Sequence, residues 1–130
     1  PAEEFQVVRQ HWDEYDFFFV HIKKTDSYGE DGKFDERVHV IETVDEALPI
    51  LLDLKPDVLV ITGDHSTPAK LKRHSWHPVP VMIAADAARF GKAGKFGETL
   101  CASGSLGFIR HVDIIPLALA HAMRLGKYGA

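Results

Sequence analysis

Cysteines, basic blocks and long apolar runs are all scarce in this sequence of 130 residues. The single cysteine, Cys101, cannot form a disulfide within the chain, which favours a reducing compartment such as the cytoplasm. Acidic residues outnumber basic ones by 19 to 15, and no basic block could follow a phosphate backbone, so we expect no nucleic acid partner. The apolar runs are far shorter than the roughly 20 residues that span a bilayer, so we expect no membrane segment.

The length and composition indicate one domain. Hydrophobic residues make up 45% of the chain, which is enough for one sizeable core, while 130 residues are too few for two comfortable ones. We therefore expect residues 1–130 to form a single α/β unit. The chain begins at Pro1 without an initiator methionine, so we expect either removal of that methionine or a piece of a longer protein.

The spacing of apolar residues predicts alternating helices and strands. The predicted helices span residues 2–13, 34–52, 68–73 and 113–125, the second kinked at Pro49 and the last capped by Asp113. The predicted strands span residues 17–22, 57–61 and 78–84, and the predicted loops span residues 25–32 and 86–107. The strand at 17–22 is apolar throughout, as in a strand buried on both faces. Because a helix separates the first two strands, we expect them to be parallel, in a mostly parallel sheet.

Side chains that can bind a metal follow two of these strands. Asp26 and Glu30 come after the strand at 17–22, and the adjacent pair Asp64 and His65 comes after the strand at 57–61. Ligands bind at the carboxyl edge of parallel strands, so we expect these groups to converge there. His74 precedes its strand, so strand order alone does not place it at that edge. Carboxylates and imidazoles together suit Mn, Zn or Co, and Mg where oxygen ligands prevail.

Several of the polar residues also have simpler interpretations. Asp26 and Asp31 could build an Asx-turn, which is the favoured interpretation for Asp31, and Ser66 or Thr67 could cap the helix predicted after Pro68. His21 is interpreted as a core histidine. The histidines interpreted as solvated are His11, His39, His111 and His121. Lys23 and Lys24 are interpreted as a solvated strand end. For Asp64 and His65 a ligand role is favoured, because both occupy the preferred ligand position of the fold.

Ordered blocks of the sequence resemble a known enzyme family. The blocks at residues 21–32, 60–68 and 74–81, together with the ending at 106–130, are similar to the C-terminal part of the archaeal-type cofactor-independent phosphoglycerate mutases. These enzymes belong to the alkaline phosphatase superfamily. The resemblance implies part of a three-layer αβα sandwich with a mostly parallel, alkaline-phosphatase-like sheet.

The resemblance also implies two divalent metal ions, Mn, Mg, Zn or Co, on either side of a phosphorylated serine. The implied ligands of the first metal are Asp26, Glu30 and His74, and those of the second are Asp64 and His65 with an N-terminal aspartate and the serine. Glu30 stands where the family has histidine, so that site either prefers Mg or Mn, which are harder ions, or no longer uses this position. His77 is near enough in sequence to contact phosphate or to support a ligand.

The family's N-terminal metal-binding aspartate, its serine nucleophile and its arginine-rich substrate segment have no counterpart in these residues. We therefore expect no catalytic residue in this chain, and either the C-terminal portion of a longer mutase or a homologue that lacks the catalytic half. The implied reaction interconverts 3-phosphoglycerate and 2-phosphoglycerate through a phosphoserine, in cytoplasmic glycolysis and gluconeogenesis, without 2,3-bisphosphoglycerate. A metal-dependent phosphatase or phosphodiesterase of the same superfamily would use nearly the same ligands, and a non-catalytic module could keep the fold.

Overall fold

The computed structural model describes residues 1–89 and 94–126. It contains two compact units, one formed by residues 1–56 and 67–76 and the other by residues 57–66 and 77–130. The expectation of a single α/β unit over the whole chain stays a prediction.

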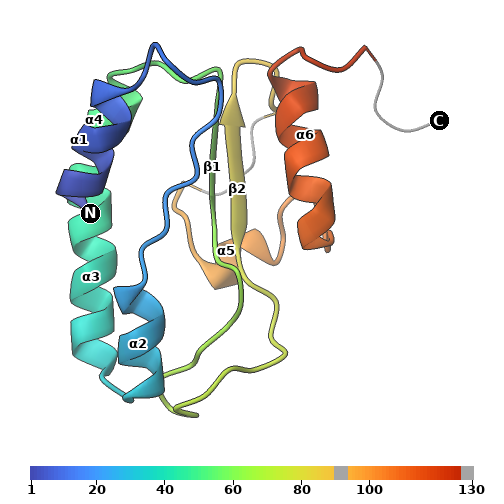
Figure 1. Cartoon of the computed structure of the whole chain (residues 1–130). Helices are drawn as coiled ribbons and strands as arrows, with labels where there is room; N and C mark the ends of the chain where they lie inside the picture. Colours follow the sequence, from blue (N-terminus) through green and yellow to red (C-terminus); the bar gives the residue numbers. More distant parts are fainter. Residues whose placement is uncertain (90–93, 127–130) are drawn as a thin grey trace. The chain divides into compact units, whose positions relative to one another are not determined.

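The first unit is helical (Figure 1). Its helices are α1, Ala2–Gln10, α2, Lys24–Glu30, α3, Phe34–Ala47, and α4, Pro49–Leu52. The helix predicted at residues 2–13 is confirmed as α1, which is three residues shorter than expected and buries Phe5 and Val8. The long helix predicted at 34–52 is divided into α3 and α4 next to Pro49, because proline cannot donate the backbone hydrogen bond that would continue the helix.

A small apolar core holds the helices of the first unit together. Helix α1 packs against α3 and α4, and α2 packs against α3. The core consists of Phe5, Val8, Val40, Ala47 and Ala69. A guanidinium N–H of Arg9 also donates to the carbonyl oxygen of Ile50 at 3.3 Å, which ties α1 to α4. These contacts hold α3 in place, and α2, which carries Asp26, packs against α3.

Two local predictions in this unit are wrong. Residues 25–32 were expected to form a loop, yet most of them belong to α2. Contacts from outside the helix explain this, since Gly29 fits closely against the carbonyl of Thr67 and the Asp26 carboxylate accepts the Thr67 hydroxyl hydrogen bond. The helix expected at 68–73 is instead a turn. It begins at Pro68, whose carbonyl accepts turn hydrogen bonds, and Lys72 has a φ of 53°.

The strand expected at residues 17–22 is also not formed. This segment is extended and carries no strand pairing, and its side chains alternate between half-buried and exposed positions. Phe17 is 63% exposed and Phe19 is 80% exposed, whereas the sequence predicted burial on both faces. A strand requires a partner for its backbone, and the described part of the chain supplies none here.

The second unit contains the sheet, formed by β1, Val58–Thr62, and β2, Val81–Ala85 (Figure 1). Both strands lie close to the predicted ranges of 57–61 and 78–84. They pair antiparallel, with Val60 opposite Ile83, so the expectation of mostly parallel pairing is wrong for this pair. The reason is the connection, because no helix links β1 to β2 and the right-handed crossover rule therefore does not apply.

Helices complete the second unit. Helix α5, Glu98–Cys101, lies within the loop predicted at 86–107, of which residues 90–93 are outside the described residues. The predicted last helix begins as a 3-10 turn, His111–Asp113, and continues as α6, Ile114–His121, which packs on β1 and ends four residues before Leu125. Asp113 caps the turn through the backbone N–H of Arg110 at 3.1 Å rather than capping α6. None of the helices in the described part of the chain is long and apolar enough to cross a membrane.

Candidate metal centre

The centre of the candidate site in the first unit is Asp26, near the start of α2. Its side chain is almost fully buried. One carboxylate oxygen, Oδ1, accepts a hydrogen bond of 2.7 Å from the Thr67 hydroxyl, and the other, Oδ2, is paired with the Lys23 ammonium. Burying a carboxylate is costly unless it is paired and hydrogen-bonded, and these contacts meet that condition. The Asp26 carboxylate is therefore held in a fixed orientation.

Thr67 in turn is fixed from two sides. Only 1% of its surface is exposed, and its carbonyl oxygen accepts a 2.5 Å hydrogen bond from a guanidinium N–H of Arg37 on α3. Gly29 lies against the same carbonyl, so closely that a Cβ at this position would collide with the oxygen. The glycine thus allows α2 to approach the Thr67 backbone. As a result, the Thr67 hydroxyl is aimed at Asp26.

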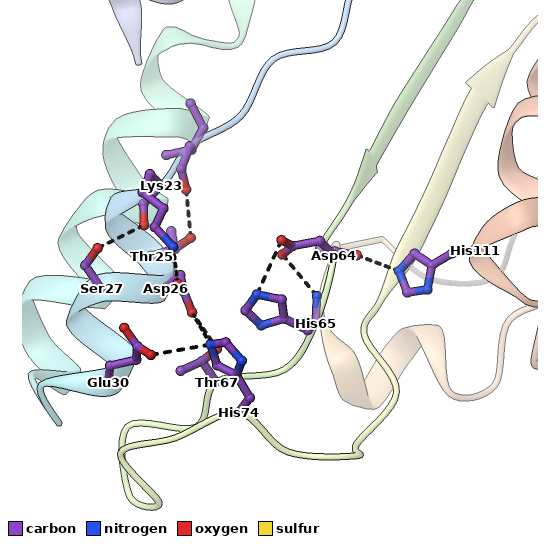
Figure 2. A network of polar contacts seen from close by, with 12 residues as sticks. Lys23, Thr25, Asp26, Ser27, Glu30, Asp64, His65, Thr67, His74 and His111 are labelled. Atoms are coloured by element: carbon purple, nitrogen blue, oxygen red, sulfur yellow. Dashed lines mark hydrogen bonds and ion pairs between the residues drawn. The ribbon is translucent and has the colours of Figure 1, made fainter.

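Glu30 and His74 complete this cluster. Glu30 is the last residue of α2, one helical turn after Asp26, so both carboxylates lie on the same side of the helix. His74 follows the turn at residues 69–72 and points back toward α2 (Figure 2). Its Nε2 atom lies 3.4 Å from Asp26 Oδ1 and 3.4 Å from Glu30 Oε1. The structure therefore brings together the three residues that the sequence resemblance assigned to the first metal.

These distances are longer than usual hydrogen bonds and are compatible with a shared metal ion. A hydrogen bond between nitrogen and oxygen is usually about 2.7–3.2 Å long, so 3.4 Å is beyond the usual range. Two ligand atoms bound to one ion at about 2.0–2.1 Å in tetrahedral geometry lie roughly 3.3–3.4 Å apart. One imidazole nitrogen and two carboxylate oxygens also form a donor set that Mn or Zn accepts. The carboxylate of Asp26 and the imidazole of His74 thus form a donor pair that fits a divalent cation, with Glu30 next to His74.

Asp64 and His65 lie together in the second unit, directly after β1. The Asp64 Oδ1 atom accepts a 3.0 Å hydrogen bond from the backbone N–H of His65, and its Oδ2 atom lies 3.3 Å from the His65 Nε2 (Figure 2). Asp64 is exposed, and His65 is half-buried. The pair therefore offers one carboxylate and one imidazole from a single loop, which by themselves are too few for a complete coordination shell.

The loop before this pair is held by a residue that the sequence did not single out. The Nε2 atom of His111 lies 2.9 Å from the carbonyl oxygen of Gly63, and the hydroxyl of Thr62 donates to the carbonyl of Pro80 at 3.0 Å. His111 was interpreted as a solvated side chain, yet it fixes the backbone immediately before Asp64. No sequence signal marks this role, because it depends on a contact between residues 48 positions apart.

Lys23, Arg37 and Thr67 were missed in the same way. Lys23 was interpreted as a solvated strand end and Thr67 as a possible helix cap, but both contact the Asp26 carboxylate. The only available signal was a polar side chain close in sequence to a predicted ligand. Such a signal does not distinguish a supporting residue from a solvated one. His77 is exposed in the segment that leads into β2, and its expected phosphate contact stays a prediction.

Comparisons with known proteins agree with a metal site. The sequence profile of the metalloenzyme superfamily matches residues 2–121. The chain is 64% identical over 128 residues to a protein of Thermosipho africanus (strain TCF52B) named "Probable 2,3-bisphosphoglycerate-independent phosphoglycerate mutase", a match that covers 98% of this chain and 32% of that protein. A protein of Aquifex aeolicus (strain VF5) with the same name is 56% identical over 128 residues, with 98% and 31% covered.

A solved structure is also similar. The structure titled "Structure of PH0037 protein from Pyrococcus horikoshii" matches with a TM-score of 0.90 at 37% sequence identity. The match covers 98% of this chain and 39% of that chain. The chain thus spans about a third of the length of the relatives it matches.

Proposed function

This chain belongs to the metalloenzyme superfamily, and we propose on that basis that it is the metal-binding C-terminal part of a 2,3-bisphosphoglycerate-independent phosphoglycerate mutase. The full-length enzyme interconverts 3-phosphoglycerate and 2-phosphoglycerate through a phosphoserine whose serine lies outside this chain. The similarity to the named Thermosipho protein, 64% over 128 residues, supports the activity. The cluster of Asp26, Glu30 and His74 is the structural observation that carries the proposal.

In this proposal Asp26, Glu30 and His74 hold the first divalent metal ion. The equal distances of 3.4 Å from the His74 Nε2 to oxygens of both carboxylates support Glu30 as a ligand in place of the family's histidine. A second carboxylate makes the site harder and more negative, which favours Mn or Mg over Zn or Co. Lys23 and Thr67 keep the Asp26 carboxylate oriented, as outer-shell partners do in metal sites.

Asp64 and His65 bind the second ion together with groups from the rest of the full-length protein. The chemistry that the ions supply is to lower the pKa of the serine nucleophile and to neutralise the phosphoryl oxygens during transfer. The residues of this chain position the ions. His111 keeps the loop that bears Asp64 in place through the carbonyl of Gly63, and His77 contacts the phosphate group or supports a ligand.

An assay of the full-length protein tests the proposal. The protein, given 3-phosphoglycerate and Mn²⁺ without 2,3-bisphosphoglycerate, should form 2-phosphoglycerate. The variant His74→Ala should lower the rate by more than the roughly 10- to 100-fold that loss of an outer-shell partner costs. The matched control is His39→Ala, which removes an exposed histidine from α3 at 75% exposure and should leave the rate unchanged.

Other outcomes of the same assay identify the alternatives. Release of inorganic phosphate without 2-phosphoglycerate would show a phosphatase, since water would then accept the phosphoryl group. If the protein neither forms 2-phosphoglycerate nor releases phosphate from 3-phosphoglycerate with Mn, Mg, Zn or Co, the result would point to a non-catalytic module that retains the fold. As a mutase, the protein would serve glycolysis and gluconeogenesis in the cytoplasm, and the free thiol of Cys101 agrees with a reducing compartment.

A further inference from the structure

The turn that precedes His74 is attached to α2 at two points. The first is Gly29 within the helix, which lies against the carbonyl of Thr67. The second is Gly32, just after the helix, where the atoms nearest to the position of a Cβ all belong to the side chain of Lys72. Because the two glycines are three residues apart, both contacts lie within one turn of the helix. The chain before His74 is therefore fixed against the end of α2.

The way in which α2 ends creates the second contact. The N–H of Gly32 donates to the carbonyl of Gly29 at 3.1 Å, and the N–H of Lys33 donates to the carbonyl of Tyr28 at 2.8 Å. This is the Schellman ending, in which a glycine takes a positive φ, here 73°. A Cβ on Gly32 would collide with Cε of Lys72 and lie 3.1 Å from its Cγ and Cδ. The aliphatic stem of Lys72 thus fills space that the missing side chain leaves.

The backbone of Lys72 has a conformation that lysine rarely adopts. Its φ of 53° lies in the left-handed region, where Cβ crowds the following carbonyl. The N–H groups of Leu71 and Lys72 both donate to the carbonyl of Pro68, at 2.9 and 3.0 Å, so Lys72 ends a tight turn. Glycine would take this conformation without strain, and the contact of the stem with Gly32 gives a reason for lysine instead. Strained residues of this kind often mark functional sites.

The reversal at Lys72 directs His74 back to α2. The His74 Nε2 atom lies 3.4 Å from Asp26 Oδ1 and 3.4 Å from Glu30 Oε1, and Figure 2 shows the ring facing both carboxylates. The side chain of His74 is 55% exposed, so surrounding atoms enclose it only in part. The position of its imidazole therefore depends strongly on the backbone that presents it.

We propose that Lys72 is a positioning residue for the candidate metal centre. Its left-handed backbone turns the chain toward α2, and its stem, packed on Gly32, holds the turn there, so that His74 meets Asp26 and Glu30. The lysine acts through this contact and not through its charge. The inference rests on the proposed function in taking the three clustered side chains to be metal ligands.

Variants of the full-length protein separate the stem, the charge and the backbone of Lys72. Lys72→Gly permits the left-handed conformation but removes the stem. Lys72→Met keeps an unbranched stem and removes the charge. The matched control is Lys70→Gly, which removes an exposed lysine from the same turn and introduces the same flexible residue. If the stem positions His74, only Lys72→Gly should disturb the centre.

A calorimetric titration with Mn²⁺ measures the effect on the centre. Lys72→Gly should weaken roughly 10-fold the binding equivalent that His74→Ala removes, as loss of an outer-shell partner does, and should leave the other equivalent unchanged. Lys72→Met and Lys70→Gly should titrate like the wild type. Adding Lys72→Gly to His74→Ala should have no further effect, whereas a general structural defect would weaken the remaining equivalent as well.

The metal-free protein gives a second measurement. The ring-proton NMR signals of His74, identified by their loss in His74→Ala, should move toward random-coil values in Lys72→Gly and stay in place in Lys72→Met. This measurement decides the matter even for a protein that binds no Mn²⁺.

Three results would overturn the proposal. They are wild-type ring signals and affinity in Lys72→Gly, an equal loss in Lys72→Met, which would show that the charge acts, and an equal loss in Lys70→Gly. Mutase activity is read separately. A protein that binds Mn²⁺ and shows these effects without forming 2-phosphoglycerate refutes the proposed function alone, and an active mutase in which Lys72→Gly behaves like the wild type refutes the positioning role alone.

Discussion

The buried hydroxyl of Thr67 provides a sharp test of how Asp26 is held. It donates a 2.7 Å hydrogen bond to the carboxylate, and only 1% of Thr67 is exposed. The variant Thr67→Val keeps the shape of the side chain but replaces the hydroxyl with a methyl group. The carboxylate then loses one of its donors in a place that water does not reach.

The expected cost follows from the contacts that remain. A hydrogen bond to a charged group contributes about 1.5–3 kcal/mol. Asp26 keeps its ion pair with Lys23 and its contact with His74, so we expect the lower end of that range. A loss of about 1.5 kcal/mol corresponds to roughly a tenfold fall in the folding equilibrium constant.

Urea unfolding of the wild type and the variant measures this loss. The matched control is Thr43→Val, since the Thr43 hydroxyl donates at 2.8 Å to Val40 O within its own helix, a local bond that adds little stability. The variant Thr67→Ser, which keeps the hydroxyl, should retain most of the Asp26 contact. If Thr67→Val loses no more free energy of unfolding than Thr43→Val, within about 0.5 kcal/mol, the buried hydrogen bond does not hold Asp26 as described.

Further variants probe other parts of the structure. Gly29→Ala should lower the free energy of unfolding by about 1–3 kcal/mol, because its Cβ meets the Thr67 carbonyl, and unchanged urea unfolding would refute that close approach. Glu30→Gln should weaken Mn²⁺ binding ~10-fold or more in a titration, and an unaltered affinity would show that Glu30 is not a ligand. The hydrogen bonds from Arg110 lower the pKa of Asp113 from its ordinary 3.8, so this pair stabilises the fold above that value and loses its effect as the pH falls through the lowered pKa. Asp113→Asn should therefore reduce the melting temperature at pH 7 but not in strong acid, and an equal reduction at both pH values would argue against the ion pair.

Local sequence patterns predicted the elements whose formation depends on local features. Helix α1 has acidic residues in its first turn and apolar residues at helical spacing, and β1 and β2 are short β-branched and apolar runs. Pro49 correctly marked the break between α3 and α4. These signals lie within a few residues of the structure they specify.

The failures involve distant contacts. Helix α2 contains Asp26, Ser27 and Gly29, which favour turns, and becomes helical where Thr67 and α3 pack against it. The apolar residues at 17–22 do favour a strand, but strand formation requires a partner, and the described residues provide none. The antiparallel pairing of β1 and β2 likewise depends on the path of a long connection, which residue periodicity does not encode.

The clustering of the first three candidate ligands did not depend on the sheet, and their role as ligands stays a prediction. Asp26, Glu30 and His74 were chosen by resemblance, and strand order alone did not place His74 beside the other two, yet its Nε2 lies 3.4 Å from an oxygen of each carboxylate. Helical spacing places Glu30 one turn after Asp26, and a turn returns His74 to the same helix. Sequence could not reveal Lys23, Thr67 or His111 as supports, because each acts through geometry rather than through a motif.

The most direct test of the central claim is a calorimetric titration of the full-length protein with Mn²⁺. If Asp26, Glu30 and His74 hold one of two ions, His74→Ala should lose one binding equivalent, while His39→Ala should titrate like the wild type. Binding by His74→Ala with the wild-type stoichiometry and affinity would contradict the assignment of this cluster as a metal centre.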